Sequence, residues 1–265
     1  MATERHTPVA LTIAGSDSGG GAGIQADLKA FAACGVHGTS AIVALTAQNT
    51  IGVSAIHAVP PEMIMEQVRA IATDIGVDAA KIGMLGDEAT IAAVVDALGE
   101  IGDAPVVVDP VMVAESGAVL LEAGAKRALA ERVLPLAAVA TPNLSEAREL
   151  SGLGETAGSE ELARAVQALG PGAVVVTGGH GDDHADVFFD GESVEKIEGP
   201  WHPEGPAHGS GCTHSAALAA HLALGASPLK AAREARRIAA QAVGAGLRDV
   251  GAGTGPVDVL GIIES

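Results

Sequence analysis

A short run of small residues around one cysteine is the part of this sequence best suited to chemistry. Gly209, Ser210, Gly211 and Cys212 lead directly into an alanine- and leucine-rich stretch that continues to Leu224. This pattern predicts a helix whose first turn carries no bulky side chains. The unpaired N–H groups of such a turn, together with the helix dipole, favour negative charge. The pattern therefore predicts a phosphate-binding site.

Cys212 lies in the field of this predicted helix start. A thiol at a helix N-terminus has a lowered pKa and can act as a base or a nucleophile. An ordinary capped helix with a small buried cysteine would give the same pattern, because a single Gly-x-Gly before a helix is a weak signal. The residues alone leave both interpretations open.

Further polar side chains follow the apolar runs that we interpret as strands. In an open α/β sheet, ligands bind beyond the carboxyl ends of the strands, so these side chains should converge at one edge. The segments concerned are Gly15 to Gly23, Gln48, Met84, Asp109, Asn143 with Glu146, and Thr177 to Gly179.

Three of these residues suggest specific ligands. The amide of Gln48 offers both a donor and an acceptor, which suits a heteroaromatic ring, although it would also serve in a turn. Asp109 and Glu146 are candidate Mg²⁺ carboxylates, since this ion commonly takes one or two acids plus substrate phosphates. A strand-end turn for Asp109 and a helix cap for Glu146 are the structural alternatives.

Other clusters have simpler explanations. The fragment from Gly21 to Ala26 fits G-x-G-x-x-A but lacks the acidic residue of a dinucleotide site, and G-x-x-x-x-G-K-[ST] does not occur. We interpret 180–186 as a polar hairpin loop, because it offers no fixed set of four metal ligands. Packing accounts for His214 and His221, a core position suits Cys34, and a solvated helix face accounts for Arg233, Arg236 and Arg237.

The elements that position these residues alternate along the chain. Apolar, β-branched runs predict strands over 9–14, 39–47, 53–58, 81–85, 105–112, 136–140 and 173–176. Helical patterns lie between them, over 24–32, 61–75, 87–98, 124–134 and 160–169, with a short helix from 144, and two helices over 210–224 and 228–247 end the series. A hairpin is expected at 186–197 and an edge strand at 255–260, and Met63, Ile64, Val68 and Ile71 should face inward. Such alternation implies a mostly parallel sheet with helices on both faces, and we expect one domain over residues 1–265.

Composition excludes several classes of function. The chain has 15 basic and 33 acidic side chains and a formal charge of −18, which argues against nucleic acid and anionic membrane surfaces as partners. The acidic balance is similar to that of proteins from salt-loving organisms. The two cysteines form no C-x-x-C pair, and no apolar run approaches a membrane span, so we expect a soluble protein of the reducing cytoplasm.

Six segments, in order along the chain, resemble the hydroxymethylpyrimidine/phosphomethylpyrimidine kinases, a family with the ribokinase-like fold. They are residues 14–29, 44–50, 81–85, 109–112, 141–146 and 208–213. The resemblance implies a three-layer α/β sandwich that uses ATP and Mg²⁺ to phosphorylate 4-amino-5-hydroxymethyl-2-methylpyrimidine and then its monophosphate in thiamine biosynthesis. It also implies a homodimer.

Carried over by position, the resemblance assigns a role to each candidate. The aminopyrimidine would contact Gln48, Gly15, Asp27, Met84 and Val111. The anion hole would be formed by Gly209, Ser210, Gly211 and Cys212, with Cys212 in the place where related sugar kinases carry an Asp base. The nucleotide side would comprise Asp109, Asn143, Glu146, Thr177 and Gly179, with the metal at Asp109 and Glu146.

The chain departs from the family pattern at two positions where the family usually has a lysine. Thr177 stands where the family usually has a Lys before Gly-Gly-His, and Glu115 replaces the usual lysine of Ala-Lys-Ser-Gly. Two alternatives therefore remain at this point: a pyridoxal/pyridoxine kinase of the same fold, and a non-catalytic pyrimidine-binding protein. The sequence Gln48-Asn49-Thr50 favours the pyrimidine over pyridoxal.

Overall fold

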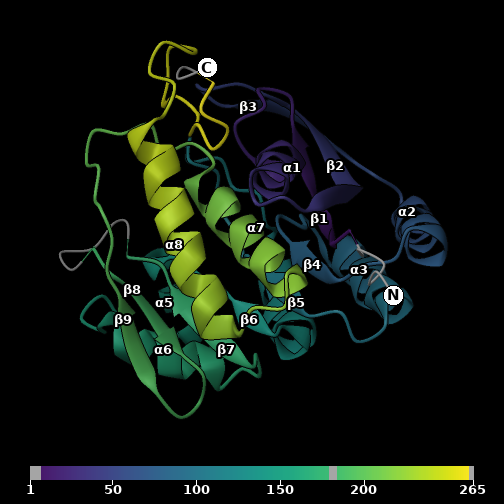
Figure 1. Cartoon of the computed structure of the whole chain (residues 1–265). Coiled ribbons are helices and arrows are strands. Elements are labelled where there is room, and N and C mark those ends of the chain that lie inside the picture. Colours follow the sequence, from purple (N-terminus) through teal and green to yellow (C-terminus); the bar gives the residue numbers. More distant parts are fainter. Residues whose placement is uncertain (1–6, 179–183, 263–265) are drawn as a thin grey trace, which may run out of the picture.

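A nine-stranded sheet forms the centre of the computed structural model, which describes residues 7–178 and 184–262. The strand order is β3-β2-β1-β4-β5-β6-β7-β8-β9 (Figure 1). The strands are β1 (Val9–Asp17), β2 (His37–Gln48), β3 (Val53–Ala58), β4 (Ala79–Ile82), β5 (Val106–Val108), β6 (Val139–Ala140), β7 (Ala173–Val176), β8 (Asp186–Phe189) and β9 (Val194–Ile197). Pairing is parallel from β2 to β7, and β3, β8 and β9 are antiparallel to their neighbours.

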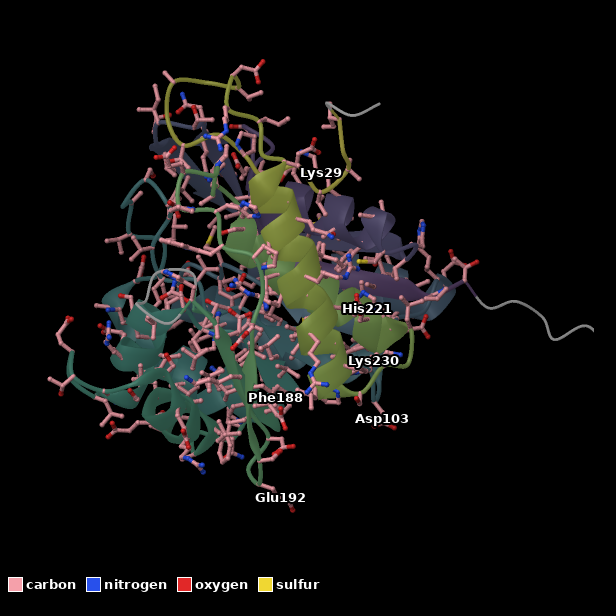
Figure 2. All side chains as sticks on the ribbon, turned by 60° about the vertical axis from the view of Figure 1, so that its left-hand side comes forward. Lys29, Asp103, Phe188, Glu192, His221 and Lys230 are labelled. Atoms are coloured by element: carbon pink, nitrogen blue, oxygen red, sulfur yellow. The ribbon has the colours of Figure 1, made fainter. Side chains whose placement is uncertain are left out.

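Helices cover both faces of the sheet and complete three layers. One face carries α1 (Gly23–Ala33), α7 (Ser210–Ala223) and α8 (Pro228–Gly244). The other carries α2 (Pro61–Asp74), α3 (Glu88–Leu98), α4 (Ala123–Ala128), α5 (Leu144–Ser151) and α6 (Ser159–Gln167). Figure 2 looks onto α8, with labels on Phe188 of β8 and on Glu192 in the turn towards β9. The predicted α/β sandwich is thus confirmed.

Two apolar cores hold these layers together. Side chains of a strand alternate between its two faces, so Leu11 and Ile13 of β1 join the core under α2 to α6, whereas Ala10 joins the core under α1, α7 and α8. The alanines of α7 let that helix pack close to the sheet, and the residues from Thr213 to Ala220 are all buried. The start of α7 is therefore held firmly against the strand ends.

The carboxyl ends of the parallel strands lie side by side, as the alternation predicts. Ile82 pairs in register with Val108, and Val108 with Ala140. Beyond them, Asn143 forms an isolated bridge with Thr177. The loops that leave these strand ends carry the candidate site residues.

Several sequence predictions about single elements are wrong. The segment 255–260 adds no edge strand, because it folds over α8 and the chain before α7: Asp258 N donates to Ala242 O at 2.9 Å, and Val257 N to His208 O at 3.1 Å. Met63 is 52% exposed, whereas Ile64, Val68 and Ile71 are the buried side chains of α2.

Two further helix predictions also need correction. The helix expected over 124–134 ends as a regular α-helix at Ala128 and continues as a wider turn from Leu129 to Val133. Arg233 and Arg237 are exposed as expected, but Arg236 is buried, because its guanidinium contacts Asp186 and the carbonyl of His184.

Candidate active site

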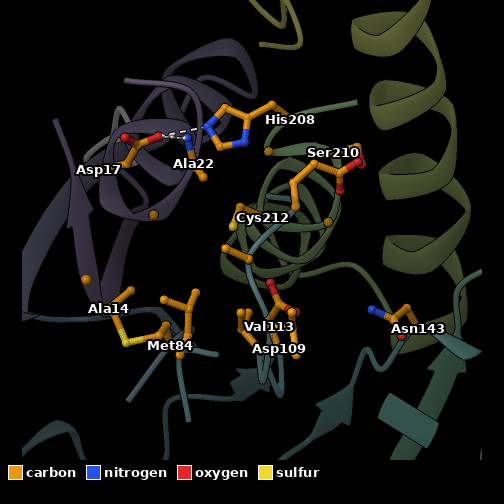
Figure 3. A pocket seen from close by; sticks show the side chains of 18 of the residues that line it. Ala14, Asp17, Ala22, Met84, Asp109, Val113, Asn143, His208, Ser210 and Cys212 are labelled. Carbon is orange, nitrogen blue, oxygen red and sulfur yellow. Dashed lines mark hydrogen bonds and ion pairs between the residues drawn. The ribbon is translucent and has the colours of Figure 1, made fainter. Parts of the chain in front are cut away.

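A cavity of about 150 Å³ opens at the carboxyl ends of the parallel strands (Figure 3). It brings together most residues selected from the sequence, and its lining includes Gly15, Gln48, Met84, Asp109, Val111, Asn143, Glu146, Thr177 and all four residues from Gly209 to Cys212. Two candidates are not among the lining residues: Asp27 is buried beneath the cavity, and Gly179 lies outside the described residues. Convergence at one sheet edge is therefore observed for residues spread over almost 200 positions of sequence.

The start of α7 faces this cavity with open N–H groups. Gly209 has a φ of 83°, and no side chain caps the helix. Ser210 N donates to Ala207 O at 2.9 Å, whereas the N–H groups of Gly211 and Cys212 belong to the first turn and have no acceptor within the helix. Only glycine fits at 209, because a Cβ there would lie 1.8 Å from the carbonyl oxygen of Gly21. The two N–H groups therefore face the cavity at the place where the sequence predicts an anion hole.

Asp17, at the end of β1, connects the glycine-rich loop to the segment before α7. Its carboxylate accepts hydrogen bonds from the N–H groups of Gly19 (2.7 Å), Gly21 (3.0 Å) and Ala22 (2.8 Å). His208 Nε2 lies 3.0 Å from Asp17 Oδ2 and must donate, since a carboxylate only accepts. Burial alone would raise the pKa of Asp17, but the hydrogen bonds from His208 and the backbone outweigh it and lower the pKa.

A buried charge network lies beneath the cavity. The ammonium of Lys81 donates to both oxygens of Asp27, at 2.9 and 3.1 Å, and lies 3.6 Å from Asp109 Oδ2. Thr12 donates to Asp27 at 2.6 Å and Ser215 to Asp109 at 2.9 Å. Burial would lower the pKa of Lys81, but the negative charges of Asp27, of Cys212 when it is ionised, and of Asp109 raise it, so the ammonium stays charged. Asp27 thus positions Lys81 and does not line the cavity itself.

The Cys212 thiol does not have the lowered pKa that its place at a helix start suggested. Burial raises its pKa to about 12; Lys81 opposes this rise, and the negative charges of Asp109 and Asp27 add to it. A hydrogen bond from Gly23 N–H lowers the pKa by less. Without a ligand, therefore, Cys212 is a protonated thiol facing two carboxylates.

Asp109 and Glu146 lie on the same wall of the cavity, and both are buried. Asn143 and Glu146 form a capping box, in which Asn143 N donates to Glu146 Oε2 at 3.0 Å and Glu146 N to Asn143 Oδ1 at 2.9 Å. Burial, and then the charge of Asp109, raise the pKa of Glu146 to about 8. Glu146 therefore caps the helix α5, as the structural alternative expected, and its carboxyl group still lines the cavity.

Asp109 and Glu146 suit Mg²⁺, which takes part of its ligands from water and phosphate, better than they suit a metal ion bound by protein side chains alone. Among the described residues no group of three or more His, Cys, Asp or Glu side chains could hold a metal. Mg²⁺ needs only one or two carboxylates when water and phosphate oxygens complete its shell. The cavity also collects the negative charges of Asp17, Asp109 and Glu115, which attract a cation.

The opposite end of the sheet edge provides a small apolar and amide-lined space. Met84, Ala14 and Val113 contribute apolar surface, and a Cβ on Gly15 would lie 2.4 Å from Met84 Cε. Thr46 Oγ1 donates to Ser16 O at 2.9 Å and lies 3.2 Å from Gln48 Oε1, so the Gln48 amide lies beside this hydroxyl at the edge of the space. A flat ring with polar edge atoms fits these walls.

A second cavity, of about 390 Å³, adjoins the first. The two share Glu115, Asn143, Thr177, Ala207, Ser210 and Gly211, so they meet over the start of α7. Thr177 and Glu115, the two positions without the expected lysines, lie at this junction. The arrangement provides a small chamber and a large one on either side of the uncapped start of α7.

Sequence reasoning missed three functional candidates: Asp17, Lys81 and His208. Each stands inside a motif already selected, namely before the glycine-rich loop, before Gly83-Met84 and before Gly209. A charged residue inside an apolar strand, as Lys81 is in Ala79–Ile82, was the available signal. Its partner Asp27 is 54 positions away, so the pairing itself could not be read from the sequence.

Comparisons with known proteins agree with this geometry. The sequence model of the family described as phosphomethylpyrimidine kinase matches residues 17–258. The chain is 48% identical over 257 residues to the hydroxymethylpyrimidine/phosphomethylpyrimidine kinase of Rhizobium meliloti, covering 95% of this chain and 96% of that protein. It superimposes on an ADP complex of Bacillus subtilis pyridoxal kinase with a TM-score of 0.88 and 36% identity, over 98% of this chain and 100% of that one. A phosphomethylpyrimidine kinase from Clostridium difficile gives a TM-score of 0.76 with 38% identity, over 86% and 96%.

Proposed function

Because the chain belongs to the phosphomethylpyrimidine kinase family, we propose that it transfers the terminal phosphoryl group of ATP to 4-amino-5-hydroxymethyl-2-methylpyrimidine, and then to its monophosphate. The observation that carries this proposal is the meeting of two cavities over the uncapped start of α7. The small chamber suits the pyrimidine and the large one the nucleotide.

Each wall then has a defined task. Gln48 binds the aminopyrimidine, with Gly15, Met84 and Val111 closing the chamber around it. The N–H groups of Gly211 and Cys212 stabilise the charge on the migrating phosphoryl group. Phosphoryl transfer depends mainly on such positioning and charge stabilisation, so no lysine-bearing loop is required.

Cys212 is proposed as the base that takes the proton of the substrate hydroxyl. Its raised pKa in the free protein comes from burial and from two neighbouring carboxylates, while Lys81 opposes them. Asp109 and Glu146 would hold Mg²⁺, with Asn143 and Thr177 beside them on the nucleotide side. A bound Mg²⁺ would supply charge neutralisation for the phosphates and for these carboxylates. The thiol would then lose its proton to solvent more readily, and the resulting thiolate could accept the proton of the substrate hydroxyl.

A pyridoxal kinase activity is the second candidate, favoured by the close superposition on the Bacillus subtilis pyridoxal kinase. The test is to offer purified protein Mg-ATP with hydroxymethylpyrimidine, its monophosphate and pyridoxal in parallel, in low and in multimolar KCl. Phosphorylation of both pyrimidines supports the proposal. Turnover of pyridoxal with neither pyrimidine would replace it with the second candidate.

Assembly and compartment complete the proposal. The exposed apolar side chains of Leu45 and Ile56 on β2 and β3 are consistent with a homodimer, which light scattering of the purified protein would test. Two free cysteines, Cys34 and Cys212, suit a cytoplasmic setting. In the part of the chain that the structure describes, no helix has the length and apolarity needed to span a membrane.

A further inference from the structure

The only tryptophan of the chain, Trp201, lines the larger cavity. It follows β9, in the segment that runs beside α8 before the chain turns into α7 (Figure 1). Its ring is stacked on that of His184, with ring centroids 3.5 Å apart and an interplanar angle of 11°. Trp201 lines the cavity whereas His184 does not, so the histidine covers the indole from behind. The other side of the indole is left to the cavity, and 48% of the residue is exposed.

Arg236 holds the His184 end of this stacked pair in place. Its Nη2 donates to the carbonyl oxygen of His184 at 2.6 Å, and its Nη1 lies 3.8 Å from Asp186 Oδ1. Asp186 in turn accepts from Gly178 N at 3.0 Å and contacts His214 Nε2 at 3.0 Å. The buried Arg236 of α8 thus links β8, through Asp186, to His184, the residue on which Trp201 stacks. Asp186 also contacts His214 of α7, so all three elements hold His184 in place.

The rest of the lining suits a flat ring with polar edge atoms. α8 contributes the apolar side chains of Ala239, Ala240 and Val243. Arg236 and His214, which are 8% and 4% exposed, also line the cavity, and Arg236 Nε and His214 Nδ1 have no hydrogen-bond partner. A heteroaromatic base could place its faces against this apolar and aromatic surface.

The larger cavity offers few positively charged side chains to the phosphates of a nucleotide. Among the described residues that line this cavity, Arg236 is the single Lys or Arg side chain, and it is already bonded to His184. Glu115 and Thr177 bring no positive charge to the junction where the phosphates would lie. The side chains of this cavity therefore add little positive charge to that of the proposed Mg²⁺, so contacts with the base should contribute a larger share of the binding free energy.

We propose that Trp201, supported by His184, is the base-stacking residue for the nucleotide and that it determines how tightly the base is held. This inference deepens the proposed function and rests on it for the identity of the ligand as a nucleoside triphosphate. Stacking of a base on an aromatic side chain has the strength for this role, since loss of the side chain weakens binding by about tenfold or more.

The test uses Trp201 as its own reporter. In the full-length protein, ADP should change the intrinsic tryptophan fluorescence, whereas inorganic tripolyphosphate should not, because it has no base. Calorimetry should show that Trp201→Ala weakens ADP binding by about tenfold while tripolyphosphate binding stays within about twofold, and that Trp201→Phe restores most of the loss. Leu224→Ala is the matched control, because Leu224 is 46% exposed and lines neither cavity.

Equal ADP affinity in wild type and Trp201→Ala, or fluorescence that does not respond to ADP, would overturn the inference. A parallel loss of ADP and tripolyphosphate affinity would also overturn it, since it would indicate damage to the whole site. The proposed function fails separately, through absence of pyrimidine phosphorylation. Pyrimidine turnover with an unchanged KM for ATP in Trp201→Ala would remove the stacking role alone.

Discussion

Replacing Asp17 with Asn tests whether one carboxylate holds the glycine-rich loop against the start of α7. In its better orientation, the amide oxygen keeps the bonds from Gly21 N, Ala22 N and His208 Nε2, and the new NH₂ group faces Gly19 N. The partly exposed Gly19 N–H then loses its carboxylate partner, and the remaining bonds lose the help of a charged acceptor. Together these effects should lower the free energy of unfolding of Asp17→Asn by about 1–3 kcal/mol.

Urea unfolding followed by circular dichroism at pH 7 measures this loss directly. Asp190→Asn is the control, because Asp190 also accepts from two backbone N–H groups, of Glu192 at 3.0 Å and Ser193 at 2.8 Å, but in an exposed turn. Its effect should be much smaller. A loss at Asp17 below about 1 kcal/mol, or equal to that at Asp190, would refute the role given to this carboxylate.

The stability of the wild-type protein and that of Asp17→Asn should depend differently on pH. Because the pKa of Asp17 is lowered in the folded protein, its ionisation stabilises the fold fully above the unfolded-state pKa of about 3.9 and progressively less as the pH falls below it. The stability gap between wild type and Asp17→Asn should therefore be constant from about pH 8 to 5 and shrink below about pH 4. A gap that widens in acid would contradict the lowered pKa.

Three further substitutions or reactions probe the transfer site. Cys212→Ala should reduce kcat by about 10²-fold or more if the thiol is the base, and unchanged turnover would remove it from that role. In the free protein, iodoacetamide should alkylate Cys212 with a rate that still rises above pH 10, because burial raises the pKa of this thiol to about 12; a plateau near pH 9, the behaviour of a free thiol, would contradict this. Gln48→Ala should raise KM for the pyrimidine by about tenfold and leave KM for ATP within about twofold, and the reverse pattern would place the pyrimidine elsewhere.

The sequence predicted the layers and most of the site because both follow from local pattern. Alternating strands and helices imply parallel strands, and parallel strands put Gln48, Asp109 and Asn143 at one edge whatever the details of packing. Gly209 and Gly211 likewise predict that the first turn of α7 carries no bulky or capping side chain. These predictions need no knowledge of which side chains meet.

What the sequence could not supply were the contacts between distant residues. Asp27 lies in the right motif, but its pairing with Lys81 places it under the cavity. Cys212 stands at a helix start, yet burial and the charges of Asp109 and Asp27 reverse the expected direction of its pKa. Arg236 lies among exposed arginines, and only its contacts with His184 and Asp186 show that it is buried.

The central claim is that main-chain amides at the start of α7 hold the migrating phosphate between the nucleotide and the pyrimidine. A crystal structure with a non-hydrolysable ATP analogue, Mg²⁺ and hydroxymethylpyrimidine tests it most directly. We expect the terminal phosphate within hydrogen-bond distance of Gly211 N and Cys212 N, with the pyrimidine ring against Gln48. A terminal phosphate bound away from residues 209–212, with those N–H groups facing water, would contradict the account.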